Sequence, residues 1–586
     1  MTRTHALLLL LVSHPLTASP AWGRSALASA PARQEPSTDA SKDREEPRDE
    51  AAATLVFERP PEEPTDDARA AARFHGLEYG DDELRLAAPG LAELRAGFDR
   101  LRRLGPARGG PPAIGYSMFF GGAYGGATAF VGPAARPLPV LQDRPETLEA
   151  LAFASIGELG ALLRARRVTS VELTELSLAR LERLDAKLLC VARLCRERAL
   201  ESARRADREL AAGHDRGPLH GIPYGAKDLL DTRGLATTYG SALFAERVPE
   251  ADAAVIERLD AAGAVLVAKL SLGELAWGDV WVGGKTRNPW NTAQGSSGSS
   301  AGSASATAAG AVVFAIGSET CGSLVSPSTR CATTAVRPTF GRVSRAGAME
   351  LSWTLDKLGP IARSVEDAAL VLAAIAGEDP RDPTTLGAPK YVPTGLFDLQ
   401  ANTHPKLGIA QGAWRDPAEE ARVREELLAL GFTLEPVELP KLPVADVLAI
   451  LVAEAASAFD DVTREKKDGL MVRQVADAWP NVMRQGQLIS AVEYLRAQRV
   501  RRVLAGELEA LLLRYEAVVH PSDDDAWVIA TNLSGHPTVC APSLRDAQGA
   551  WHGVSFTARA FGETRAIAVA EAWQRAGKAH LVHPEL

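Results

Sequence analysis

The sequence has few cysteines and no cluster of metal-binding side chains. Its 586 residues include only five cysteines and 11 histidines, and no C-x-x-C spacing joins any two of the cysteines. Structural zinc sites and disulfide-stapled folds both require closely spaced cysteines. We therefore expect neither a metal site nor a disulfide framework, and nothing in the sequence points to a cofactor.

Blocks of positive charge are also absent. The net charge is −9, and the arginines near residues 180–210 alternate with glutamate and aspartate, as on the solvated face of a helix. Proteins that bind nucleic acid usually carry a clustered basic patch. We expect no nucleic-acid partner.

Long apolar runs are missing as well. No segment reaches the roughly 18 uninterrupted apolar residues that indicate a transmembrane helix, so we expect no stable membrane span. The chain begins "MTRTHALLLLLVSHPLTASPAWG", with Arg3, a short apolar run and then small residues. This layout is typical of a secretory signal peptide. We predict a signal peptide at 1–30 and export to the periplasm or the medium.

Composition divides the rest of the chain. Residues 31–68 are rich in Pro, Glu, Asp and Arg and poor in apolar side chains, which predicts a disordered acidic spacer. Residues 69–149 form an N-terminal extension whose role the sequence does not indicate. From about residue 150 the hydrophobic pattern becomes regular, and we place one catalytic domain at 150–586.

Helices and short apolar strands alternate in this domain. Thr169 and Glu172 form a capping box ahead of an amphipathic run, and Ser364 begins another helix that ends near Gly377. The segment "AVLVAKL" is typical of a buried strand, and "WHGVSFTARAFGETRAIAVAEAWQRA" of a strand followed by a helix. Such alternation predicts a layered α/β domain.

The stretch "GSSGSSAGSASATAAG", residues 295–310, has the composition of a flexible linker. It leads directly into the apolar run "AVVFAIGSETCGS", however, and small residues also let a backbone turn sharply beside a ligand. Two readings follow. The segments around Ser299 and Ser323 are either tight turns flanking a buried helix, or catalytic turns in which residues 320–323 aim their amides at one point as an oxyanion hole.

Lys227 lies in "GIPYGAKDLLDT" after apolar and small residues. A lysine in such surroundings loses hydration, and its neutral form becomes accessible as a base. The alternative is an ordinary surface lysine beside Asp228.

The residues Gly298–Gly302 fit G-x-S-x-G, the nucleophile elbow of α/β-hydrolases, with Ser300 as nucleophile. That motif requires a strand directly before it. The preceding "TRNPWNTAQGSS" is rich in Pro, Asn and Gly and does not predict a strand. We therefore reject the elbow.

Taken together, these motifs resemble the amidase signature family. The resemblance rests on "GPLHGIPYGAKDLLDTRGLATTYGS", on "SSGSSAGSASATAAGAVVFAIGSETCGSLVSPSTR", on "LDKLGPIARSVEDAALVLAAIAG" and on "TNLSGHPTVCAPS". It extends over about residues 150–580. It implies an α/β fold of the amidase signature type, with a large, mixed, twisted β-sheet covered by helices on both faces.

The resemblance also implies a Ser–Ser–Lys triad. Lys227 is placed as the base, Ser299 as the serine that follows a cis peptide bond, and Ser323 as the nucleophile. Backbone amides of Thr320, Cys321 and Gly322 would form the oxyanion hole, with Ser300 supporting the network by hydrogen bonds; no metal takes part.

Three positions depart from the family pattern. Cys321 stands where the family usually has glycine, Glu319 where it commonly has aspartate, and Val325 where arginine is common. Cys321 adds bulk at the oxyanion turn and is itself a rival nucleophile, although no histidine lies near it in the sequence.

The sequence therefore predicts an exported amidase that converts a carboxamide to a carboxylate plus ammonia or an amine, through an acyl-enzyme on Ser323. One alternative is the glutamine-hydrolysing component of an amidotransferase, which works within a tRNA-dependent complex. Another is a non-catalytic binding protein on the same fold. The expected partner is a small-molecule amide, and the oligomeric state is left open, a homodimer being one option.

Overall fold

The computed structural model describes residues 66–104, 143–391 and 405–586. The predicted signal peptide and all but the last residues of the predicted spacer lie outside the described residues. Helix α2 begins at Asp66, inside the predicted spacer, so an ordered element begins slightly earlier than the sequence indicated.

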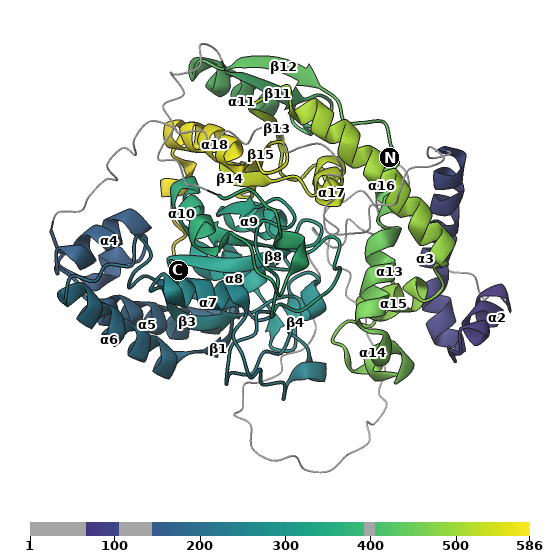
Figure 1. Cartoon of the computed structure of the whole chain (residues 1–586), viewed down its shortest axis with the longest axis horizontal. Helices are drawn as coiled ribbons and strands as arrows, with labels where there is room; N and C mark the ends of the chain where they lie inside the picture. The colour runs from purple at the N-terminus through teal and green to yellow at the C-terminus, as the bar shows by residue number, and fades with distance from the viewer. Residues whose placement is uncertain (1–65, 105–142, 392–404) are drawn as a thin grey trace.

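One mixed sheet of eleven strands runs through the centre of the molecule (Figure 1). Strands β2, β3 and β8 are parallel neighbours, as are β11, β12 and β13, whereas the other neighbouring pairs are antiparallel. In spatial order the strands are β1 (Val191–Leu194), β3 (Val265–Leu270), β2 (Pro223–Lys227), β8 (Phe314–Glu319), β10 (Lys357–Ala362), β9 (Thr334–Arg337), β14 (Thr538–Arg545), β15 (Trp551–Thr557), β13 (Ala517–Pro521), β11 (Lys406–Ala410) and β12 (Thr433–Val437). The predicted large mixed sheet is confirmed.

Helices cover both faces of this sheet and form a further group beside it (Figure 1). In chain order they are α2 (Asp66–Phe74), α3 (Asp81–Leu104), α4 (Ile156–Arg164), α5 (Ser170–Leu188), α6 (Arg196–Ala211), α7 (Ala254–Ala261), α8 (Ala301–Ala308), α9 (Val325–Cys331), α10 (Val365–Ile375), α11 (Pro417–Ala429), α12 (Val444–Val447), α13 (Ala449–Ala458), α14 (Asp460–Arg464), α15 (Trp479–Gly486), α16 (Ala491–Leu512), α17 (Asp525–Ser534) and α18 (Glu563–Gly577).

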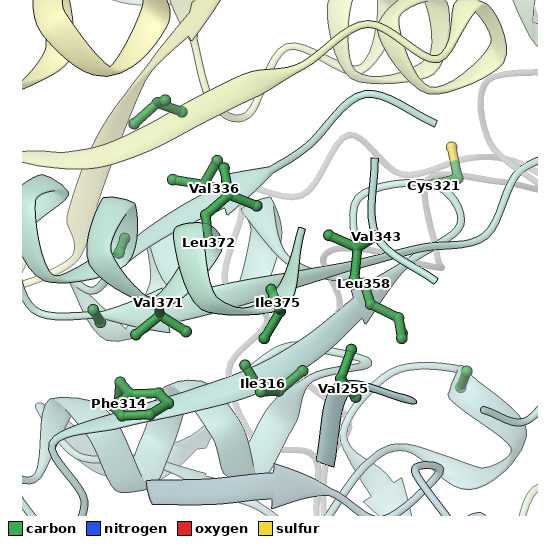
Figure 2. Close-up of a cluster of buried hydrophobic side chains, with 14 of the residues drawn as sticks. Val255, Phe314, Ile316, Cys321, Val336, Val343, Leu358, Val371, Leu372 and Ile375 are labelled. Atoms are coloured by element: carbon green, nitrogen blue, oxygen red, sulfur yellow. The ribbon is translucent and has the colours of Figure 1, made fainter. Parts of the chain in front are cut away.

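Alternating side chains divide the central strands between two helical layers. On one face, Phe314, Ile316 and Leu358 pack in a hydrophobic cluster with Leu372 and Ile375 of α10 (Figure 2). On the other face, Ile361 packs with α8 and α9. Since successive side chains of a strand point to opposite faces, Lys357 and Glu319 lie on the α8–α9 face.

The helices and the strand that local sequence patterns predicted are present in the structure. Thr169 and Glu172 make both hydrogen bonds of a capping box at the start of α5. Ser364 caps α10 by accepting from the amide of Asp367. The segment predicted as a buried strand is β3, and all of its residues are buried.

One expectation was wrong. The segment before Ser299 was not predicted to contain a strand, yet Arg287–Asn288 (β6) and Asn291–Gly295 (β7) form a small antiparallel ribbon. A turn at Asn288–Asn291 brings the two short strands together, a pairing that a propensity argument on polar residues misses. The ribbon is separate from the large sheet.

The first two helices are packed onto the main body. Helix α3 contacts α12, α15 and α16. Arg100 forms a bidentate pair with Asp446, and Leu101 is fully buried in the main core. Part of the N-terminal extension is therefore integral to the fold. Among the described residues, no helix has the length and hydropathy needed to cross a membrane.

Candidate active site

Lys227 is the last residue of β2 and is completely buried. Its Nζ lies 2.8 Å from Ser299 Oγ, 3.1 Å from Ser300 Oγ and 2.9 Å from Ser318 Oγ. The neighbouring Asp228 pairs with Lys269 at 3.0 Å. Lys227 is thus not a surface lysine paired with Asp228, but a buried amine surrounded by hydroxyl groups.

Burial lowers the pKa of Lys227 well below its ordinary value of 10.5, and the negative charges of Asp356 and Glu319 only partly oppose this shift. A charged ammonium group is costly to bury where only neutral hydroxyls contact it. The neutral amine, which can accept a proton, is therefore the favoured form over a wider pH range than for an exposed lysine.

The glycine-serine stretch is an ordered turn that leads into the buried helix α8. The peptide bond between Gly298 and Ser299 is cis, as the resemblance implies. Ser299 and Ser300 are both fully buried, so the stretch is not a flexible linker. Ser300 Oγ donates to the Ser318 carbonyl at 3.1 Å and accepts from the Ser318 amide at 3.2 Å.

Close packing explains why glycine stands opposite this turn. A Cβ on Gly317 of β8 would lie 2.7 Å from Ser300 Oγ and 2.7 Å from a methyl group of Leu324. Any larger residue would push the serine turn away from the end of the strand. The small side chains are therefore needed for Ser300 to approach β8.

The second turn, residues 320–323, connects β8 to α9. Gly322 has a φ of +95°, a conformation that favours glycine. Among the described residues, the backbone N–H groups of 320–323 donate to no acceptor. Unpaired amides at one sharp turn are the donors that an oxyanion hole requires.

Ser323 lies beside the first turn. Its carbonyl accepts from the Ser300 amide at 3.2 Å, and the residue is 7% exposed, whereas Ser299 is 0% exposed. Its hydroxyl makes no hydrogen bond to Ser299 or to any other described residue. The structure thus brings Lys227 into contact with Ser299 and places the Ser323 turn next to them, but it does not join the two serine hydroxyls. The triad roles remain a prediction.

Glu319, one of the departures, anchors the helix that follows Ser323. One carboxylate oxygen accepts from the amides of Leu324 and Val325, at 2.7 and 3.0 Å, and the other contacts Arg337 and Asn532. Burial would raise the pKa of Glu319, but the charge and hydrogen bond of Arg337, together with Lys357 and Asn532, lower that pKa below its ordinary value. The longer glutamate is therefore held as an anion at the start of α9.

Cys321 is buried and belongs to the main hydrophobic cluster, and in Figure 2 it lies at the edge of the labelled group. Burial raises the pKa of its thiol to about 12. Since the thiolate is the nucleophilic form of cysteine, this environment argues against Cys321 as the nucleophile.

Sequence reasoning missed two residues of the site. Ser318 supplies the third hydroxyl at Lys227, and Asp356 accepts from Thr320 Oγ1 at 2.6 Å. Both lie inside motifs quoted from the sequence, Ser318 in "GSETCGS" and Asp356 in "LDKLGP". Only the pairing of β8 with β10 shows that they meet at one place.

In the part of the chain that the structure describes, acidic, histidine and cysteine side chains do not gather into a metal site. Within 66–104, 143–391 and 405–586, no three or more of them are placed to bind one ion.

Comparison with known proteins identifies the family. The family model described as Amidase matches residues 172–528, more than half of the chain. A protein described as putative amidase AmiD from Mycobacterium tuberculosis is 34% identical over 471 residues, which cover 74% of this chain and 97% of the relative. A glutamyl-tRNA(Gln) amidotransferase component from a Cyanothece strain is 33% identical, over 74% of this chain and 100% of the relative.

Comparison with solved structures supports the same family assignment. The native peptide amidase of Stenotrophomonas maltophilia superposes with a TM-score of 0.66 at 29% identity, over 75% of this chain and 99% of the peptide amidase. A related structure holds a peptide amidase with the competitive inhibitor chymostatin, at the same TM-score and identity. The chain therefore belongs to the amidase signature family and is an amide hydrolase.

Proposed function

We propose that the protein cleaves a carboxamide through an acyl-enzyme formed on Ser323. The observation that carries the proposal is the buried amine of Lys227, whose Nζ lies 2.8 Å from Ser299 Oγ. Beside it is the turn 320–323, whose four backbone amides donate to no acceptor among the described residues. A base, a relaying hydroxyl and oxyanion donors are the parts that covalent amide cleavage requires.

In the proposed reaction, neutral Lys227 accepts the proton of Ser299, and Ser299 accepts the proton of Ser323. Ser323 Oγ then attacks the amide carbon, and the amides of the 320–323 turn stabilise the oxyanion. Each such donor is worth about 3–4 kcal/mol of barrier in enzymes where one has been removed. Ser299 passes its proton to the leaving amine and regains one from Lys227, and water then hydrolyses the ester.

The step between the two serines requires their hydroxyls to come into contact. Catalytic hydrogen bonds are often long in the free enzyme and tighten in the substrate complex. Since the Ser300 amide already bonds to the Ser323 carbonyl, a small rotation of the Ser323 side chain is the motion that we expect substrate binding to select.

Peptide amides are the substrates to test first, because peptide amidases match the fold over about three quarters of this chain. Ammonia release is measured from peptide amides, amino-acid amides and simple carboxamides, with Ser323→Ala and Lys227→Ala as controls. Release that both variants abolish supports the proposal. Release that survives Ser323→Ala contradicts it.

The amidotransferase alternative rests on the amidotransferase relatives, which are as similar to this chain as the amidase relatives are. Purified chain that releases ammonia from carboxamides without any partner protein supports the amidase. Activity that is limited to glutamine and needs added partner proteins supports the alternative.

Export is proposed from the N-terminal sequence alone. Cell fractionation followed by N-terminal sequencing of the mature protein tests it. A mature chain that lacks the first residues, in the periplasm or medium, is expected, and an intact N-terminus on cytoplasmic protein would overturn it.

A further inference from the structure

The hydroxyl of Thr320 ties the oxyanion turn to the strand next to it. Thr320 directly follows β8, and Asp356 directly precedes β10; the register of these antiparallel strands pairs Glu319 with Lys357. Thr320 Oγ1 donates to Asp356 Oδ1 at 2.6 Å, and Thr320 is 6% exposed. The first residue of the turn therefore takes its position from Asp356.

Asp356 is held in turn by the loop that precedes it. Its Oδ2 accepts from the amides of Leu351 and Ser352, both at 2.8 Å. With both oxygens engaged, the carboxylate cannot rotate unless it loses a hydrogen bond. The loop 351–356 therefore helps to fix the position of Thr320 by holding Asp356.

A buried glutamate on α13 fixes that loop. Glu454 is 1% exposed, and its carboxylate accepts from Ser352 Oγ, from the Thr354 amide at 3.2 Å and from Thr354 Oγ1 at 2.8 Å. Tyr494 OH on α16 donates to the same carboxylate at 2.7 Å. All of these donors converge on one side chain.

Arg501 on α16 binds the same loop through Thr354. It is fully buried and donates to Thr354 Oγ1 at 2.7 Å and to the Thr354 carbonyl at 2.5 Å. Its Nε donates to the carbonyl of Leu533 at the end of α17. The loop is thus clamped between α13 and α16, which stand beside the sheet (Figure 1).

We propose that Asp356 and Glu454 are positioning residues of the active site, through which helices α13 and α16 set the oxyanion turn by way of the Thr320 hydroxyl. Neither residue touches the reacting atoms; both set the position of the turn through Thr320. Buried polar networks with every member satisfied are rigid. Rigid donors stabilise a transition state because they need no reorganisation when charge develops, and small displacements of such groups cost large factors in rate.

Asp356 has a second effect that separates it from the rest of the network. Its charge and that of Glu319 are the two that raise the pKa of Lys227 against the larger, opposite effect of burial. Asp356→Asn is therefore expected to lower the pKa of Lys227 further. The midpoint of the rise of kcat/KM with pH should then move to lower pH. Thr320→Val changes no charge and is expected to leave that midpoint in place.

The inference rests on the proposed function, and the experiment keeps the two apart. Thr320→Val, Glu454→Gln and Tyr494→Phe are assayed for kcat and KM per active site, counted by fluorophosphonate labelling. We expect kcat to fall about 10-fold or more in the first two and a few-fold in the third, with KM within about 3-fold. Thr320→Ser, which restores a hydroxyl, is expected to recover most of kcat.

Glu563→Gln is the matched control. Glu563 is as buried as Glu454 and pairs with Arg342 at 2.9 Å, and its hydrogen bonds go to Thr339 and Arg342 and not to the turn or the loop 351–356. It is expected to lower the melting temperature while kcat per active site stays within about 2-fold, because structural damage alone reduces the folded fraction and not the rate of folded enzyme.

A double-mutant cycle between Thr320→Val and Glu454→Gln completes the test, because residues in one network give non-additive effects. Losses in kcat that are clearly less than multiplicative support the inference. Multiplicative losses, or variants that match Glu563→Gln in leaving kcat unchanged, overturn it. A Ser323→Ala variant that keeps its activity would instead refute the proposed function.

Discussion

At the residue scale, the proposed mechanism depends on which of the hydroxyls around Lys227 relays the proton from Ser323 to the amine. Ser299 and Ser318 lie at almost equal distances from Nζ, 2.8 and 2.9 Å. Of these two, only Ser299 belongs to the turn that is next to Ser323, where the Ser300 amide donates to the Ser323 carbonyl. The two serines therefore form a matched pair for testing the relay.

Ser299→Ala is expected to lower kcat by about 10²–10⁴-fold, the usual contribution of positioned proton transfer. Ser318→Ala removes one hydroxyl from the same amine but not from the relay, and a loss below about 10-fold is expected. Steady-state kinetics on one amide substrate checks both. Equal losses in the two variants would show that the relay is assigned to the wrong serine.

The buried amine also predicts the pH dependence. The neutral form of Lys227 is the active base, so kcat/KM should rise with pH as the amine loses its proton. Because burial lowers the pKa of Lys227 well below 10.5, the midpoint of this rise lies well below that value. A profile of kcat/KM from about pH 5 to about pH 11 measures it. A midpoint at or above the ordinary lysine value would contradict the assignment.

At the scale of elements, α9 is held at its N-terminus by a buried ion pair. Glu319 accepts from the first amides of the helix and from Arg337, which is itself 1% exposed. Removing one member of such a pair leaves the other charge buried without compensation. The anchor thus links the stability of the fold to the position of Ser323.

Glu319→Gln is therefore expected to lower the free energy of unfolding by about 3–5 kcal/mol and to reduce kcat. The control is Glu182→Gln, which breaks a pair with Arg196 whose side chains are 50% and 48% exposed. Exposed pairs are worth about 1 kcal/mol or less. Urea unfolding compares the two variants, and similar losses in both would contradict the account.

Elements with local signals could be predicted, and those that depend on distant partners could not. The capping box at Thr169 and the buried run that became β3 are signals within a few residues. The ribbon β6–β7 was missed because polar strands are stabilised by their pairing and not by their own side chains.

The same limit applies to the candidate site. Lys227 and the serine turns were predicted from their small and apolar neighbours and from the family resemblance. Asp356 and Glu454 were not, because an aspartate in a loop and a glutamate in a helix are ordinary in a sequence. Their contacts arise only when β10 pairs with β8 and α13 packs against the loop that precedes β10.

At the scale of the whole molecule, the helices that precede the matched family region belong to the same folded body. Leu101 of α3 is fully buried in the main core, although it lies far before residue 172. Leu101→Ala is expected to cost about 2–5 kcal/mol of unfolding free energy, as for other buried leucines.

Leu104, one turn further along α3, is 42% exposed and serves as the control. Leu104→Ala is expected to change stability by about 0.5 kcal/mol or less. If denaturant unfolding shows no difference between the two variants, the first helices do not contribute to the core.

The central claim is that Ser323 is the nucleophile, and mass mapping of a covalent adduct tests it most directly. The protein is treated with a fluorophosphonate, digested, and the modified residue identified by mass spectrometry, with Ser323→Ala and Lys227→Ala treated alongside. The account predicts one adduct, on Ser323, that is lost in the first variant and forms far more slowly in the second. An adduct on Ser300 or Cys321, or labelling that persists in Ser323→Ala, would contradict it.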